Sequence, residues 1–148
     1  MLPNIVLFRG QDALNDAGLW ETNGTGIGTF ELAPTGTGAQ GLSPSSITVL
    51  GGRVLFEGVD LSGDSGLWTT DGTAVGTAEL TSIVRASSAG IAPSDLTVFG
   101  SEALFSGINT SGQTGLWTTD GTANGTSELA GIIGAAAAGV APSDLTVG

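Results

Sequence analysis

The sequence predicts an all-β fold made from three copies of one short unit. Leu-Trp pairs begin at positions 19, 67 and 116, and Leu-Phe pairs begin at positions 7, 55 and 104. Turn sequences of the form Asn-Gly-Thr or Asp-Gly-Thr begin at 23, 71 and 120, so each motif returns after 48 or 49 residues. Self-similarity at a fixed period of this length is the signature of a repeat architecture. The 26 glycines show no collagen-like period and therefore indicate turns and close backbone approaches.

Each unit divides into four short strands. In the best-defined unit we expect strands at 95–99, 103–106, 115–119 and 127–129, because β-rich runs alternate there with turn residues. Asp-Gly at 120–121 suits the turn between the third and fourth strands, since both residues tolerate positive φ. The small apolar segment 132–141 is interrupted by glycine, so we expect a half-buried connection and no long helix.

The first unit is split between the two ends of the chain. Ile5–Phe8 matches the second strand of the unit, whereas Asp144–Val147 matches its first strand. We expect one repeat domain, 1–148, with units at approximately 5–53, 54–102 and 103–148. A split unit is typical of a ring that is closed by strand pairing, and an unpaired strand edge would otherwise promote aggregation.

Four-stranded units of this length predict β-propeller blades, and propellers usually have four to eight blades. Three blades leave a ring open, so we expect a homodimer in which two chains form six blades. The alternative is a β-trefoil, a monomeric fold that also has threefold internal repetition. An open solenoid or another sandwich is the remaining possibility.

Composition excludes several functions. The net charge is −11, with three arginines and no lysine, which argues against nucleic acid or an anionic membrane as a partner. His, Cys, Lys and Tyr are all absent, which removes the usual nucleophile–base pairs, zinc sites and Schiff-base chemistry, so we expect no enzyme. A carboxylate-based glycosidase is a distant alternative, because the acidic residues recur with the repeat and so should lie apart. The N-terminus has no basic segment and no long apolar segment, so we expect no signal peptide there.

The candidate ligand-binding residues are those that repeat. An exposed indole can stack on a sugar ring, which makes a glycan the candidate partner, although packing between blades is an equally simple use of one tryptophan per unit. The Asp-Gly-Thr turns could present carboxylates to a ligand or could only stabilise themselves. The oxygen-rich loop at 60–66 resembles a calcium loop without its bidentate glutamate. The candidates are Trp20, Trp68, Trp117, Asp71 and Asp120 for ligand binding, and Asp60 and Asp64 for a metal.

The segments Gly66–Thr77 and Gly115–Thr126, together with Pro-Ser-Asp-Leu-Thr-Val at 93–98 and 142–147, resemble the bacterial ELWxxDGT-repeat family. The resemblance covers essentially the whole chain, although glycine stands at 18, 66 and 115 where the family has glutamate. It implies propeller-like tandem repeats and a secreted or cell-surface location. We therefore expect a non-enzymatic scaffold or binding module that closes by homo-oligomerisation, or else a lectin-like carbohydrate-binding protein.

Overall fold

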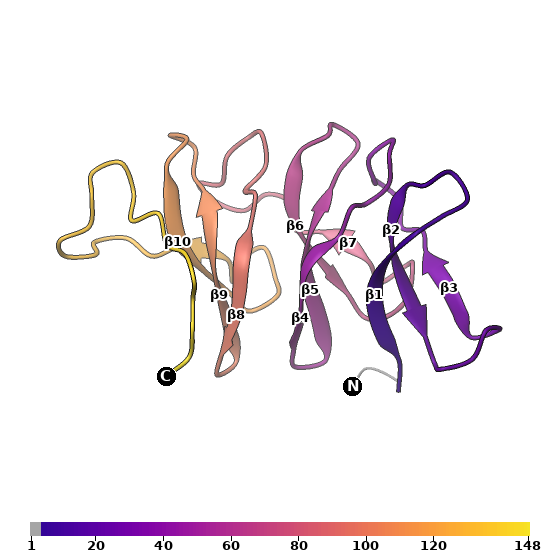
Figure 1. Ribbon diagram of the computed structural model, residues 1–148. Helices are drawn as coiled ribbons and strands as arrows, with labels where there is room; N and C mark the ends of the chain where they lie inside the picture. The colour runs from indigo at the N-terminus through magenta and orange to yellow at the C-terminus, as the bar shows by residue number, and fades with distance from the viewer. Residues whose placement is uncertain (1–3) are drawn as a thin grey trace.

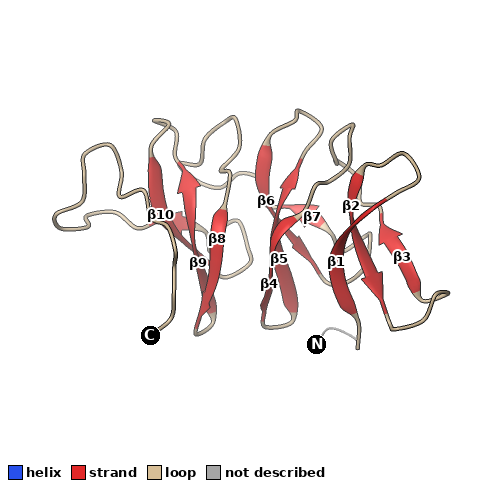
Figure 2. Cartoon of the chain, in the orientation of Figure 1, coloured by secondary structure: helices blue, strands red, loops and turns tan. Residues whose placement is uncertain are grey.

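The computed structural model describes residues 4–148 and is all-β over that range (Figures 1 and 2). Residues 1–3, at the terminus where no signal peptide is expected, lie outside the described residues. The described chain contains no helix long and apolar enough to cross a membrane. The strands form three separate antiparallel sheets that stand side by side in sequence order (Figure 1).

Each sheet is built from the repeated strands, but the sheets do not follow the expected unit bounds 5–53, 54–102 and 103–148. Residues 45–50 pair in the second sheet and residues 94–99 pair in the third. The first sheet has three strands in the order β1-β2-β3, and the other two have four strands each, in the orders β4-β5-β6-β7 and β8-β9-β10-β11. Within each sheet, consecutive strands pair, as expected when strands are joined by short turns. Their bounds are β1 Val6–Gln11, β2 Ala17–Thr22, β3 Thr29–Leu32, β4 Ser45–Leu50, β5 Arg53–Val59, β6 Ser65–Thr70, β7 Ala78–Glu79, β8 Ser94–Phe99, β9 Glu102–Ile108, β10 Thr114–Thr119 and β11 Ser127–Glu128.

The four strands expected in the last unit are confirmed as β8 to β11. A tight turn joins β8 to β9, and Gly100 lies in it with φ 67°. Near its start β8 carries a bulge, where the pairing register shifts between Ser94 and Thr97 and Asp95 has φ 56°. Bulges of this kind bend a strand and increase its twist.

The core lies between neighbouring sheets. Phe105 and Trp117 of the third sheet pack in one cluster with Leu55 and Leu67 of the second sheet. Phe56 and Trp68 of the second sheet pack in the same way with leucines of the first sheet, among them Leu19. Each sheet therefore presents an aromatic face to the sheet before it and a leucine face to the sheet after it.

The connections between units contain turns and no helix, as their interruption by glycine predicts. The segment between β7 and β8 reaches the next sheet, where Ser87 N donates to Ile108 O at 3.0 Å and Ile108 N donates to Ile91 O at 2.7 Å. Ile91 is buried in the core cluster at that point. The matching segment 132–141 is mostly exposed instead, so the expectation of a half-buried connection is wrong there, because no further sheet follows it.

The expected strand at Asp144–Val147 is also corrected, since these residues form no strand. A strand is defined by hydrogen bonds to a neighbour, and the sheet that this segment would join has its other strands at the opposite end of the molecule (Figure 1). The first sheet is consequently left with three strands.

Candidate functional site

The repeated tryptophans lie between the sheets. Trp68 and Trp117 are 1% and 0% exposed, and Trp20 is half-buried. Each indole stacks on the phenylalanine of the neighbouring strand, as in the Phe56–Trp68 pair with ring centroids 6.2 Å apart and planes 24° apart. The structure therefore gives Trp68 and Trp117 the packing role, and a sugar cannot reach their ring faces.

Glycine on the adjacent strand makes room for each indole. A Cβ atom placed at Gly58 would lie 2.8 Å from Cδ1 of Trp68, and one at Gly107 would lie 2.9 Å from Cδ1 of Trp117. Real Cβ contacts are not this short, so the indole covers bare backbone. None of the three indole N–H groups has a hydrogen-bond partner within the part of the chain that the structure describes. Apolar packing therefore accounts for these side chains.

Asp71 and Asp120 stabilise their own turns. Oδ1 of Asp71 accepts hydrogen bonds from the Thr73 hydroxyl at 2.7 Å and from the Thr73 backbone N–H at 2.9 Å. Asp120 makes the same two bonds with Thr122. Donation first from the threonine hydroxyl and then from its backbone N–H lowers the pKa of both carboxyl groups below the usual value. These carboxylates act as turn supports.

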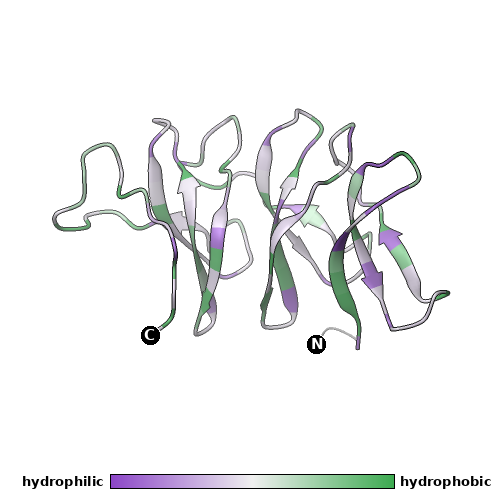
Figure 3. Ribbon diagram, in the orientation of Figure 1, coloured by the Kyte–Doolittle hydropathy of each residue, from purple (hydrophilic) through white to green (hydrophobic). Residues whose placement is uncertain are grey.

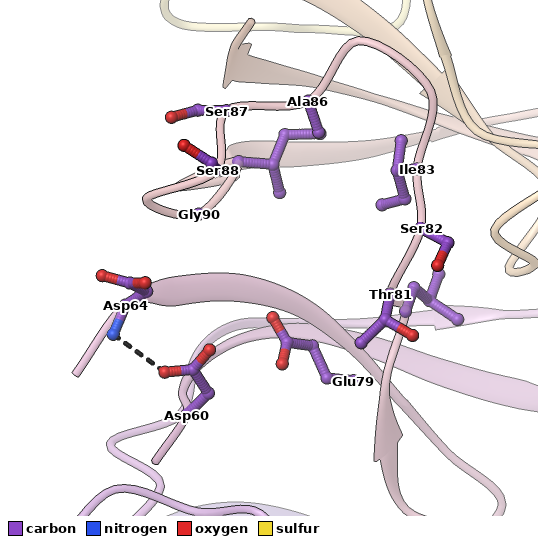
Figure 4. A pocket seen from close by; sticks show the side chains of 12 residues that line it. Asp60, Asp64, Glu79, Thr81, Ser82, Ile83, Ala86, Ser87, Ser88 and Gly90 are labelled. Carbon is purple, nitrogen blue, oxygen red and sulfur yellow. Dashed lines mark hydrogen bonds between the residues drawn. The ribbon is translucent and has the colours of Figure 1, made fainter. Parts of the chain in front are cut away.

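A pocket of about 300 Å³ lies beside the second sheet and brings together carboxylates that the sequence placed in different segments (Figure 4). Asp60 and Asp64 come from the loop between β5 and β6, and Glu79 comes from β7. The opposite wall is the β7–β8 connection, which contributes Ser87 and Ser88. In the sequence, the sign that these carboxylates lie together is that all three recur 48 residues apart, as Asp12, Asp16 and Glu31 in the first unit.

The loop holds its shape through Asp60. Its Oδ1 atom accepts the backbone N–H groups of Ser62 at 2.8 Å and Asp64 at 3.0 Å, so this carboxylate closes the loop on itself. Glu79 then reaches across Gly66, where any Cβ atom would clash with its carboxyl group. Glycine at position 66, where the family that the chain resembles has glutamate, is what allows the Glu79 side chain to lie there.

The charges in this pocket repel one another. The pKa of Glu79 is raised, first by burial of the carboxyl group and then by the negative charges of Asp60 and Asp64. The pKa of Glu31 in the first unit is raised in the same way, by burial and then by Asp12 and Asp16. Two units thus hold a glutamate whose ionisation is disfavoured.

The third unit replaces the two loop carboxylates with amides. A second pocket of about 300 Å³ contains Asn109, Gln113 and Glu128 at the equivalent positions. Asn109 Nδ2 lies 3.2 Å from Oε1 and 3.3 Å from Oε2 of Glu128, so the amide donates to the carboxylate. The same scaffold therefore forms an acidic pocket in one unit and an amide-lined pocket in the next.

A metal at Asp60 and Asp64 stays a prediction. Over residues 4–148, no group of three or more His, Cys, Asp or Glu side chains is arranged to hold a metal ion. The acidic pair recurs in the first unit as Asp12 and Asp16, whereas the third unit has Asn109 and Gln113 at these positions.

Comparison with known proteins provided no relative: neither protein-family models, nor curated proteins, nor solved structures gave a match to this chain.

Proposed function

We propose that the chain is a non-enzymatic repeat scaffold, or binding module, whose three sheets are blades of a β-propeller that is completed by a second copy. One observation carries this proposal. Between neighbouring sheets, aromatic side chains of one sheet pack on leucines of the sheet before it, and the two ends of the molecule leave one surface of each kind exposed. Catalysis has little support, since His, Cys, Lys and Tyr are absent.

The first sheet exposes the aromatic half. Phe56 and Phe105, which pack onto a preceding sheet, are fully buried. The equivalent Phe8, like its stacking partner Trp20, is only half-buried, because no sheet precedes it. Burial of these aromatic rings against a leucine face of a second copy would favour association of the two chains through the hydrophobic effect, which also stabilises the core between the sheets.

The third sheet exposes the leucine half. Leu129 and Val140 are each 38% exposed, whereas their equivalents Leu32 and Leu42 in the first unit are 3% and 2% exposed. A surface that matches a different surface on an identical chain forms head-to-tail contacts, which close into a ring when the rotation permits. With three blades per chain and four to eight blades per propeller, two chains and six blades is the ring that fits.

The first test is the mass in solution by light scattering on a sizing column. We expect twice the chain mass of 14.5 kDa. Val140→Asp should give a monomer, because it places a charge in the proposed contact. Val75→Asp is the matched control, since Val75 is 99% exposed on a loop tip and should leave the dimer intact. A wild-type monomer, or a mass that rises without limit as concentration increases, would contradict the six-bladed ring.

A lectin-like function is the second candidate, and the pockets support it where the tryptophans do not. The pocket at Asp60, Asp64 and Glu79 also contains serine and threonine hydroxyls beside aliphatic side chains. Such a mixture can form hydrogen bonds with sugar hydroxyls and pack against a sugar ring.

A glycan array probed with the full chain tests the lectin candidate. We expect a defined glycan class to bind and the Asp64→Ala variant to lose that binding, while Asp95→Ala, outside the pocket, retains it. Asp64 is preferred over Asp60, because Asp60 closes the loop and its loss would disturb the fold. Equal binding by both variants, or none by the wild type, would rule out this pocket as a glycan site.

A further inference from the structure

The first sheet has a free strand edge. In the second sheet β5 lies between β4 and β6, and in the third sheet β9 lies between β8 and β10. Among residues 4–148, the equivalent strand of the first sheet, β1, pairs with β2 and with no other strand. One side of β1 therefore presents backbone N–H and C=O groups without strand partners, which is a template for another extended segment.

An apolar groove of about 290 Å³ runs beside this edge. It is lined by Ile5, Val6 and Leu7 on one side and by Ile47, Val49 and Val54 on the other. Val6 is 62% exposed, although its equivalents Val54 and Ala103 are 2% and 0% exposed. The half of β1 nearest the N-terminus is strongly hydrophobic (Figure 3). The groove occupies the place that the first strand of a unit takes in the other two sheets.

The chain carries a segment with the sequence for that place. Residues 142–147 read Pro-Ser-Asp-Leu-Thr-Val, and so do residues 93–98, which include most of β8. The backbone agrees as well: φ is 45° at Ala141 and 55° at Asp144, against 46° at Ala92 and 56° at Asp95. The C-terminal segment thus holds the conformation of a first strand although it is not paired.

The same segment cannot reach its own β1. It lies next to β8, where Thr97 Oγ1 donates to Leu145 O at 3.2 Å, just as Thr48 Oγ1 lies 3.5 Å from Leu96 O one unit earlier. It therefore continues the row of first strands at one end of the molecule, whereas β1 lies at the other end (Figure 1). Within the described residues, the C-terminal segment is therefore not the occupant of the groove beside β1 of the same molecule.

We propose that residues 143–147 of a second copy add to the free edge of β1 as the missing fourth strand of the first sheet. This inference rests on the proposed two-chain ring and identifies the segment that closes it. The pairing of β8 with β9 sets the register, so Thr146 of the second copy lies opposite Leu7 and Val147 opposite Val6. Leu145 and Val147 then enter the groove, as Leu96 and Val98 join the core cluster.

Charge is complementary in this arrangement. Ser143 of the second copy lies opposite Arg9, and Asp144 follows it. Arg9 is one of three basic residues in the chain, and Glu57 and Ser106 occupy its position in the other two units. At this position, a basic residue is therefore found only in the first unit, whose first strand would come from a second copy.

The test uses the full chain with Leu145→Asp, compared with Leu61→Asp. Leu61 is 77% exposed in a loop, so the control adds the same charge outside the groove. We expect the dissociation constant of the dimer, from light scattering over a dilution series, to rise about ten- to a hundredfold for Leu145→Asp only, which is the value of one buried leucine. A dimer unchanged by Leu145→Asp would overturn the strand exchange and leave the two-chain ring standing.

A peptide test can support the added strand at β1 even if the two-chain ring is wrong. The synthetic hexapeptide Pro-Ser-Asp-Leu-Thr-Val is titrated into full-length Leu145→Asp protein by calorimetry, with Pro-Ser-Asp-Asp-Thr-Val as the control peptide. We expect saturable binding of one peptide per chain, and new hydrogen-exchange protection confined to β1 and the groove. Binding with a monomeric wild type would support the strand site and refute the ring, while absence of binding would refute the strand site.

Discussion

At the scale of single residues, Glu79 lies in unfavourable electrostatic surroundings. Burial and two nearby aspartates raise the pKa of its carboxyl group above the ordinary value of 4.5. A carboxyl group with a raised pKa in the folded state binds protons more tightly there than in the unfolded state. Stability is therefore lost as the pH rises from about 4.5 through the raised pKa, and the cost is fully present at neutral pH.

We expect Glu79→Gln to increase the free energy of unfolding at pH 7 by about a few tenths of a kcal/mol, because Glu79 is only partly buried and solvent screens its charge. The advantage should vanish below pH 4.5, where the wild-type carboxyl group is protonated in both states. Urea unfolding at both pH values measures the difference.

Glu128→Gln is the matched control for that prediction. Its carboxylate accepts hydrogen bonds from Asn109 in place of facing two aspartates, so the substitution removes a favourable contact. Glu128→Gln should be neutral or slightly destabilising at pH 7. Equal stabilisation by both substitutions would show that repulsion from Asp60 and Asp64 is not the cause.

At the scale of the element, a turn closed by two threonines recurs after the third strand of each unit. In the last unit, Thr119 Oγ1 and Thr126 Oγ1 are 2.7 Å apart, and Gly121 N donates to Thr119 Oγ1 at 3.0 Å. The Thr126 hydroxyl donates to Thr122 O, so the hydrogen shared by the pair comes from Thr119. This buried chain of bonds ties the third strand to the start of the fourth.

Thr119→Val should lower the free energy of unfolding by about 1–3 kcal/mol, because a backbone N–H and a hydroxyl oxygen are left buried without partners. Thr118→Val is the control on the same strand, since its hydroxyl contacts Glu102 at the surface, and it should change stability by about 0.5 kcal/mol or less. Chemical denaturation measures both. Similar losses in the two variants would contradict the role given to the buried pair.

At the scale of the whole molecule, a repeat chain is stabilised by contacts between neighbouring units, so the two end units are the least covered. The ends here are not polar caps: Phe8 and Trp20 are half-exposed at one end and Leu129 and Val140 at the other. The net charge of −11 opposes association of two copies. Salt screens that repulsion, so the proposed dimer should be tighter at high than at low ionic strength when its mass is measured.

Much of the fold follows from local sequence patterns. The period, the four strands of a unit and the Asp-Gly-Thr turns are readable because alternation and positive-φ residues act over a few positions. The tail at residues 144–147 shows the limit of such reading. Its sequence matches that of β8 at 93–98, yet it forms no strand, since strand pairing depends on a neighbouring strand that the local sequence does not supply.

For the candidate site, too, part could be predicted from the sequence and part depended on the tertiary structure. The sequence alone was enough to predict the all-β class, to reveal the 48- or 49-residue period and to show that His, Cys, Lys and Tyr are absent. Only the tertiary structure decided that Trp68 and Trp117 pack between sheets and that Asp60, Asp64 and Glu79 share one pocket. The physical reason is that backbone propensity acts between residues close in the chain, whereas burial and charge repulsion depend on which distant segments the fold brings together.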